Sequence, residues 1–402
     1  MENVEWLPPE RIPDLSDAKE IAIDLETHDP GIKTKGPGWA RNEGKVIGVA
    51  VAVEGWKGYF PVAHEGGGNF DENFFKKSLK KILDLPCDKV FHNSSYDVGW
   101  LRQWGLETKG RIIDTMIAAP LIDENRTSQG KNYSLNDLAK EYLGERKKED
   151  ELYSKALEHG VDPKGEMHLL PAMVVGPYAE KDAELTLKLW NVFKPEIIKQ
   201  ELHNIFNLET DLLPLLIDIK WKGVRVDLEK ADQIKKDLAK KEKSILQQIK
   251  KDTGVNVEIW AASSVAKAFD SVGLSYSRTE KTNAPSFHKQ FLVNHPHDLP
   301  KMIVNAREIN KARTTFIDSI LRHEHKGRIH ADINQLKTET GGTVSGRLSM
   351  QHPNLQQIPA RHPELGPLIR SIFIPDENCT WGSFDYSQQE PRILLHFAAG
   401  IN

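Results

Sequence analysis

The feature of this 402-residue sequence that most constrains its fold is a set of four acidic residues spread over three short motifs. Each acid lies near the end of a predicted strand or the start of a predicted helix; they are Asp24, Glu26, Asp97 and Asp182. If the fold brings them together, their carboxylates repel one another severely unless divalent cations lie between them. A metal site is therefore the simplest reason for this pattern.

The first half of the chain alternates between strand and helix signals. Val46–Val53 and Tyr59–Val62 flank a predicted turn at Gly55–Gly58, as in a hairpin. Ser134–Gly144 has apolar residues at helical spacing between a capping serine and a terminating glycine. Strands interleaved with helices indicate an α/β domain that extends to about residue 195.

The spacing within the motifs predicts which acids share a face. Side chains two residues apart in a strand point to the same side, so Asp24 and Glu26 should present two carboxylates together where the strand Ile21–Ile23 ends. Tyr178 and Asp182 are four residues apart, on one face of a helix whose start is predicted at Gly176-Pro177. Each motif alone is common, and the inference rests on all three together.

Carboxylate oxygens are ligands that suit Mg²⁺ or Mn²⁺. Two such ions about 4 Å apart can activate a water and stabilise the leaving oxygen during attack on a phosphodiester. The motif order, Asp24-x-Glu26-Thr27, then Asn93-x-x-Tyr96-Asp97, then Tyr178-x-x-x-Asp182, resembles that of the proofreading exonuclease superfamily with a ribonuclease-H-like fold.

This resemblance implies a 3′→5′ exonuclease that holds two Mg²⁺ or Mn²⁺ ions on the four acids. It also implies that Tyr178 orients the attacking water, with Thr27 and Asn93 as supporting residues that bind DNA. Asp114 also lies near a strand end, but the family makes no catalytic use of the matching position. We therefore predict a structural role for Asp114.

From about residue 195 to 330 the pattern is mainly helical, with a lysine-rich segment over Glu229–Lys251. Eight lysines and four acids give this segment a local charge of +4. By itself it is typical of a solvated amphipathic helix. Residues 205–402 as a whole, however, resemble the polymerase domain of family A DNA polymerases, in which the thumb occupies this position. The resemblance implies contact with the phosphates of primer–template DNA.

Two blocks carry the resemblance to the polymerase palm. Ser345–Ser349 and Pro353–Pro359 are similar to the family's TGRLS and PNLQNIP motifs. The resemblance implies three DNA-binding residues and one that contacts the phosphates of the incoming nucleotide. The first three are Arg347, Asn354 and Gln356, and the fourth is Arg370. Because the minor groove offers similar acceptors in every base pair, an arginine there can check pair geometry without reading sequence.

Phe384–Arg392 resembles the first catalytic motif of the palm. The resemblance implies that Asp385 binds a catalytic metal and that Glu390 excludes ribonucleotides. Pro391 departs from the common form, and a helix starting near Ser387 would tolerate it in or just after the first turn. The same departure in bacteriophage relatives suggests a phage origin.

The predicted fold class is α/β: a mixed sheet flanked by helices over 1–200, a mainly helical thumb region over 201–330 and a partial α+β palm over 331–402. Strand signals return in this last part, and one of the predicted strands is Trp381–Asp385. The sequence contains no match to the fingers helix or to the second palm aspartate. We therefore expect exonuclease activity but no polymerisation by this chain alone, with primer–template DNA and single-stranded 3′ ends as its partners.

Composition excludes other classes of protein. Cys87 and Cys379 form neither a metal-ligand pair nor a disulfide framework, which favours a reducing compartment. The acidic, proline-containing N-terminus is unlike a signal peptide, and the sequence has no long apolar run. We expect no membrane association and a cytoplasmic location, in the bacterial host if the protein is phage-encoded. The net charge of −4 decides little about DNA binding.

Two alternatives remain open at this point. In the first, the chain is half of a split polymerase, and a second polypeptide supplies the fingers and the rest of the palm. In the second, it is a non-catalytic fragment that binds primer–template DNA. Activity gained on mixing with a partner would favour the first, and tight binding without metal-dependent cleavage would favour the second.

Overall fold

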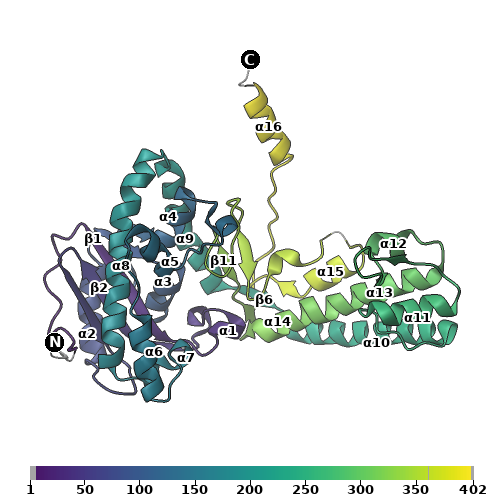
Figure 1. Cartoon of the computed structure of the whole chain (residues 1–402), viewed down its shortest axis with the longest axis horizontal. Helices are drawn as coiled ribbons and strands as arrows, with labels where there is room; N and C mark the ends of the chain where they lie inside the picture. Colours follow the sequence, from purple (N-terminus) through teal and green to yellow (C-terminus); the bar gives the residue numbers. More distant parts are fainter. Residues whose placement is uncertain (1–5, 361, 400–402) are drawn as a thin grey trace.

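A computed structural model describes residues 6–360 and 362–399 (Figure 1). An α/β part comes first along the chain, followed by an elongated group of helices and a small region of short strands between the two. The C-terminal helix α16 (Gln389–Ala399) projects away from all of these parts. Residues 1–5, where the predicted acidic N-terminus begins, lie outside the described range.

The α/β part is built on a mixed five-stranded sheet in the order β3-β2-β1-β4-β5. The central β1 pairs antiparallel with β2 and parallel with β4. Valine and alanine dominate β2, which is buried along nearly its whole length. The strands are β1 (Glu20–His28), β2 (Lys45–Val53), β3 (Trp56–Pro61), β4 (Asp88–Phe91) and β5 (Ile112–Asp114).

Both faces of the sheet are covered, because the strands alternate between two hydrophobic cores. Ile21, Ile23 and Leu25 belong to one core, whereas Ala22 belongs to the other, which includes residues of the long helix α8. The helices of this part are α1 (Ile32–Lys35), α2 (Glu72–Leu83), α3 (Ser94–Gln103), α4 (Thr115–Ile122), α5 (Leu135–Tyr142), α6 (Glu149–Glu158), α7 (Pro163–Glu166) and α8 (Ala172–Lys199).

Several sequence-based boundaries need correction. The hairpin turn is the two-residue loop Glu54-Gly55, because Val53 pairs directly with Trp56. The first strand does not end at Ile23: β1 continues to His28, with a register shift after Glu26. The long helix starts at Ala172, and Pro177 lies inside it rather than marking its first turn. The predicted helix with Ser134 as its cap is confirmed, since the Ser134 side chain accepts from the Asp137 amide.

The following region is mainly helical, as predicted, and is linked to the sheet by α9. Leu213 and Ile217 of α9 pack into the core of the α/β part. The long helices α10 and α13 then pack together in the elongated body (Figure 1). The helices are α9 (His203–Lys222), α10 (Leu228–Thr253), α11 (Ala262–Ser271), α12 (Lys289–Asn294), α13 (Asp298–Lys311), the π-helical segment Ala312–Ile317, and α14 (Asp318–His323).

Short strands connect the two large parts. A four-stranded sheet has the order β13-β6-β10-β9, so β6 joins a sheet with strands a hundred or more residues later. This sheet contains strands from both sides of residue 330, so the domain limits at 200 and 330 remain a proposal based on sequence. The strands are β6 (Val224–Val226), β9 (Glu324–His325), β10 (Arg328–Ile329), β11 (Asp332–Asn334), β12 (Ser349–Gln351) and β13 (Phe373–Ile374), with α15 (Leu365–Arg370) between the last two and the β7–β8 ribbon (Ser277–Arg278 and Pro285–Ser286) in the helical body.

A buried ion pair joins the parts where α9 meets β11. The Lys220 ammonium contacts the Asp332 carboxylate and lies 4.6 Å from the centre of the Trp39 ring. Gly36, at φ +71°, approaches Asp332 so closely that a Cβ there would collide with its carboxylate. The α/β part thus shares a packed interface with the described residues from α9 onward. Because these later residues resemble family A polymerases in sequence, we call them the polymerase-like part.

The predicted strand Trp381–Asp385 does not form, and its residues are exposed and irregular. A strand needs a hydrogen-bonding neighbour, and none of the described residues pairs with this segment. The helix that follows starts at Gln389, so Pro391 does fall in its first turn as predicted. Within the described ranges, no helix has the length and apolar character needed to cross a membrane.

Candidate functional site

Three of the four predicted acids meet in one cluster. Oxygen atoms of Asp24, Glu26 and Asp182 all lie within 4.8 Å of one another. Glu26 and Asp182 are buried, with 9% and 3% of their surface exposed, whereas Asp24 is partly open to solvent. The cluster joins β1 to α8, which are about 150 residues apart in sequence.

The alternating direction of the side chains along β1 explains why these three acids meet. Asp24 and Glu26 follow Ala22 at two-residue steps, so they face the same core as Ala22, which is the side covered by α8. On α8, Ala179 and Ala183 are buried in that core and turn the intervening Asp182 toward β1. Asp24 and Glu26 therefore lie in mid-strand and project from the face of the sheet that α8 covers, rather than lying at the end of a short strand.

The fourth acid, Asp97, lies beside this cluster in the first turn of α3. Its Oδ1 accepts a hydrogen bond from the Leu25 amide at 3.0 Å, which connects α3 to β1 between Asp24 and Glu26. Asn93 precedes α3 with φ +71°, and its amide donates to Asp114 Oδ1 at 3.0 Å. Asp114 also accepts from the Ser94 amide and hydroxyl and caps α4, which agrees with the predicted structural role.

Tyr178 and Asp182 face a lysine that the sequence did not single out. Lys147 Nζ lies 2.6 Å from Asp182 Oδ2 and 4.7 Å from the centre of the Tyr178 ring. Thr27, the residue after Glu26 in β1, hydrogen-bonds the Tyr96 hydroxyl at 2.6 Å. Lys147 belongs to the run Arg146-Lys147-Lys148, and no pattern distinguishes it from its neighbours. Only the tertiary fold selects it.

Burial and mutual repulsion dominate the electrostatics of the cluster. Burial, with the nearby Asp182 charge, raises the pKa of Asp24 to about 7 although Lys147 acts in the opposite direction. The pKa of Glu26 is raised well above its ordinary value by burial, then by Asp24 and Asp182. Burial and the Asp24 charge likewise raise the pKa of Asp97. The site holds more negative charge than its own residues neutralise.

These residues fit divalent cations. The donors are all carboxylate oxygens, which are the ligands preferred by Mg²⁺ and Mn²⁺. Asp182 Oδ1 is buried and has no hydrogen-bond partner among the described residues. A buried carboxylate oxygen without a partner is costly, and a bound cation would satisfy it.

The cluster opens into a cavity of about 1010 Å³ between the α/β part and the polymerase-like part. Asp24, Asn93 and Asp182 line it from one side, and Asn334 and Gln351 from β11 and β12 line it from the other. Both parts of the chain thus contribute walls to this cavity.

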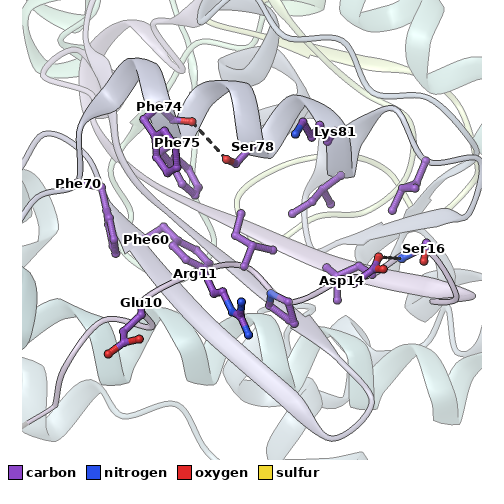
Figure 2. A pocket seen from close by; sticks show the side chains of 15 residues that line it. Glu10, Arg11, Asp14, Ser16, Phe60, Phe70, Phe74, Phe75, Ser78 and Lys81 are labelled. Atoms are coloured by element: carbon purple, nitrogen blue, oxygen red, sulfur yellow. Dashed lines mark hydrogen bonds between the residues drawn. The ribbon is translucent and has the colours of Figure 1, made fainter.

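A second cavity, of about 410 Å³, has different walls (Figure 2). Aromatic side chains gather there, namely Phe60, Phe70, Phe74 and Phe75, beside the N-terminal segment that carries Arg11. None of the predicted exonuclease residues lies in it. This aromatic cavity is therefore separate from the carboxylate cluster.

The predicted polymerase residues are scattered over exposed loops and helix ends. Arg347 and Glu390 form an ion pair with each other, and both side chains are about three-quarters exposed. Asn354 Oδ1 accepts from the Gln356 amide at 3.1 Å, and the Gln356 side chain donates to Leu348 O at 2.9 Å.

The other two predicted polymerase residues are solvent-exposed. Arg370 ends α15, and Asp385 lies in the irregular segment before α16. Among the described residues, Asp385 belongs to no cluster of acids or histidines that could hold a metal. Apart from the Arg347–Glu390 ion pair and the local Asn354–Gln356 contact, the structure therefore does not bring the polymerase residues together as it does the exonuclease acids.

Two family models match separate segments of the chain. Residues 8–198 match the 3′-5′ exonuclease family, and residues 228–400 match DNA polymerase family A. The first segment contains the whole carboxylate cluster, and the second contains Arg347, Arg370, Asp385 and Glu390.

Sequence relatives include several phage and bacterial polymerases. A DNA-directed DNA polymerase of Pseudomonas phage M6 is 36% identical over 98% of this chain and 61% of its own length. DNA polymerase DpoZ of Salmonella phage PMBT28 is 33% identical over 96% of this chain and 63% of its own length. DNA polymerase I of Pseudomonas aeruginosa is 28% identical over 96% of this chain and 41% of its own length. The chain thus spans about three-fifths of these phage relatives.

One solved structure is similar over most of the chain. The POL domain of Pol1 from M. smegmatis, in complex with DNA primer-template and dNTP, superposes with a TM-score of 0.72. The alignment covers 96% of this chain and 61% of that one at 20% identity, which supports the fold alone. From the two family matches and the phage relatives, we conclude that the chain belongs to DNA polymerase family A and carries the 3′-5′ exonuclease domain of that family.

Proposed function

We propose that this chain removes nucleotides one at a time from DNA 3′ ends by hydrolysis of the terminal phosphodiester. The observation that carries the proposal is the meeting of Asp24, Glu26 and Asp182 beside a large cavity that Asp24 and Asp182 line, with Asp97 next to them. These four acids would hold two Mg²⁺ or Mn²⁺ ions, which when bound supply a nucleophile at neutral pH and neutralise the charge of the leaving 3′-oxygen.

The remaining residues would position the substrate and the water. The Tyr178 hydroxyl, beside Asp182, would orient the attacking water by accepting or donating a hydrogen bond. Asn93 lines the cavity, and Thr27 hydrogen-bonds Tyr96, which also lines it; we assign both Asn93 and Thr27 to holding the terminal nucleotide. Asp97 is fixed by the Leu25 amide, which would keep its carboxylate aimed at the cluster. Phage relatives suggest that the reaction takes place in the cytoplasm of a bacterial host.

A primer-degradation assay tests the proposal directly. Purified protein is incubated with a 5′-labelled primer on a longer template and Mg²⁺, with and without all four deoxynucleotides, and the products are separated on a gel. We expect a ladder of shortened primers that is lost in EDTA and unaffected by nucleotides. An unchanged primer would instead support the non-catalytic DNA-binding alternative, and extension would show that this chain completes a polymerase site.

The raised pKa of Asp24 predicts how Mg²⁺ stabilises the fold at different pH. Because this pKa is about 7 in the folded protein and 3.8 ordinarily, the metal-free protein loses stability as pH rises through that window. Mg²⁺ binds the deprotonated form, so it should raise the melting temperature more at about pH 8 than at about pH 6. Differential scanning fluorimetry with Mg²⁺ or EDTA measures the two increments.

Asp24→Asn is the control for this pH dependence, because it removes the carboxyl whose pKa is about 7 while keeping the side-chain shape. In that variant the Mg²⁺ increment should be small and should vary less between the two pH values than in the wild type. Equal increments at both pH values in the wild-type protein would contradict the assignment of Asp24 as a ligand.

The lysines of α10 are proposed to bind the phosphates of primer–template DNA. Lys243 and Lys250 are exposed, lie two helical turns apart, and form no ion pair among the described residues. Lys236 and Lys240, in contrast, already pair with Asp232 and Asp237 on the same helix. The first pair is therefore free to neutralise phosphates.

Replacing Lys243 and Lys250 by alanine should weaken duplex binding and lower the slope of log K against log salt by up to about 2. Fluorescence anisotropy with a labelled primer–template at several salt concentrations measures this slope. Lys236→Ala with Lys240→Ala changes the net charge equally and should have a smaller effect. Equal effects of the two double variants would mean that overall charge, rather than this surface, governs binding.

A second candidate function concerns polymerisation. Helix α16 exposes four large apolar side chains around much of its circumference and buries none; they are Ile393, Leu394, Leu395 and Phe397. Such apolar exposure is unfavourable in water and calls for a covering surface. We propose that the fingers and the rest of the palm cover it, on the same polypeptide or on a second one. Primer extension gained by adding a polypeptide that carries those parts would support a split polymerase, and no gain would count against it.

A further inference from the structure

Lys147 lies inside the proposed exonuclease site, although no motif contains it. Its side chain is only 15% exposed, with Nζ 2.6 Å from Asp182 Oδ2 and stacked over the Tyr178 ring. It therefore contacts the two α8 residues that the exonuclease proposal uses for metal binding and water positioning. A lysine so placed cannot be a solvated surface residue.

The loop between α5 and α6 holds Lys147 in this position. The Lys147 amide donates to Asn136 Oδ1 at 3.1 Å. Two residues earlier, Glu145 forms ion pairs with Lys181 and Lys188, both on α8. These contacts hold the loop against α8, which carries Asp182. The position of the Lys147 ammonium is therefore set by the fold. The adjacent Lys148 pairs with Glu151 outside the site, and its side chain is 44% exposed.

The contact with Asp182 conflicts with full occupation of that carboxylate by a cation. Lys147 takes Oδ2, while Oδ1 is buried without a partner among the described residues. A divalent cation on Asp182 would lie close to the ammonium and repel it strongly in this buried setting. Conversely, without a cation, Lys147 is the group within hydrogen-bonding distance of Asp182 that offsets repulsion from Asp24 and Glu26.

We infer that Lys147 is a resident counter-ion of the exonuclease site, which holds Asp182 and Tyr178 in place in the metal-free protein and competes with the divalent cation for Asp182. This inference rests on the proposed exonuclease function. It assigns Lys147 a positioning role with two opposite consequences. The site stays assembled without metal, and the affinity for metal is lower than four acids alone would give.

The first test compares Mn²⁺ binding by isothermal titration calorimetry in the wild-type protein, Lys147→Met and Lys148→Met. Lys147→Met should bind Mn²⁺ at least about tenfold more tightly, since a unit charge beside a ligand is worth more than that factor at an effective dielectric constant near 20. Its melting temperature should fall below that of the wild type in EDTA, but not in saturating Mn²⁺. Lys148→Met should match the wild type. Unchanged or weaker Mn²⁺ binding by Lys147→Met would overturn the inference.

The second test uses the wild-type protein, so it does not depend on the folding of a variant. Brief acetylation of lysines followed by mass spectrometry compares labelling in EDTA and in Mn²⁺. Labelling of Lys147 should rise when Mn²⁺ displaces it from Asp182, whereas labelling of Lys148 should not change. Equal labelling of Lys147 in both conditions would overturn the inference.

The two proposals fail in different ways. Wild-type protein that binds Mn²⁺ in competition with Lys147 but leaves the primer intact would contradict the exonuclease function only. Wild-type protein that degrades the primer while Lys147→Met binds Mn²⁺ no more tightly would contradict the counter-ion role only.

Discussion

Replacing both Asp24 and Glu26 by alanine is expected to slow removal of 3′-terminal nucleotides about 1,000-fold or more. These acids supply two of the three carboxylates whose oxygens lie within 4.8 Å of one another. Without them the remaining acids cannot hold a pair of cations, and the several kcal/mol of charge stabilisation that such ions provide is lost. A loss of about 4 kcal/mol corresponds to that factor in rate. The gel assay with labelled primer measures the rate.

A matched control separates this loss from a general change in charge. Asp17→Ala with Glu54→Ala removes two exposed acids from the same part of the chain and should leave the rate unchanged. Because burial and mutual repulsion raise the pKa values of Asp24 and Glu26, the isosteric variant Asp24→Asn with Glu26→Gln should be at least as stable as the wild type in EDTA. Cleavage at the wild-type rate by either site variant would show that the nuclease site lies elsewhere.

Replacing Asp332 by alanine is expected to lower the free energy of unfolding by about 3–5 kcal/mol. Lys220 and Asp332 are 6% and 8% exposed, and their ion pair lies where the α/β part meets the polymerase-like part. The variant would leave the Lys220 ammonium buried without its ion-pair partner, beside the Trp39 ring and with the Asp29 charge as a weaker favourable influence. Burial already lowers the pKa of Lys220, and the Asp332 carboxylate counteracts that shift. Urea unfolding followed by tryptophan fluorescence measures this change, and Trp39 and Trp221, which stack at the interface, are two of the nine tryptophans that contribute to the signal.

A double variant distinguishes an unpaired charge from lost packing. Lys220→Met with Asp332→Leu removes both charges while keeping apolar volume, so it should recover most of the stability lost in Asp332→Ala. The partner His352, whose Nδ1 lies 2.8 Å from Asp332 Oδ2, is exposed enough to find water when Asp332 is replaced. If the double variant were as unstable as Asp332→Ala, packing rather than charge would account for the effect.

Much of the candidate site was predictable because its acidic residues belong to short motifs with fixed spacing. The step of two between Asp24 and Glu26 and the step of four between Tyr178 and Asp182 both predict a shared face, whatever the exact element boundaries. The predicted strand end at Ile23 and the predicted helix start at Pro177 were wrong, but these errors did not change which side chains were predicted to share a face. The strand predicted at Trp381–Asp385 failed for another reason, because a strand forms only with a hydrogen-bonding neighbour and none of the described residues provides one.

The sequence alone determined the α/β class, the family resemblance and the four candidate acids, because periodicity and motif spacing are local properties of the chain. Only the tertiary structure decided that Asp24 and Glu26 lie in mid-strand on the face of the sheet that α8 covers, since that depends on which helix covers which face. It also decided that Lys147, rather than Arg146 or Lys148, contacts Asp182, and that Lys220 pairs with Asp332. These contacts join residues 35 and 112 positions apart, and charge pairing at such a separation depends on packing that no local pattern encodes.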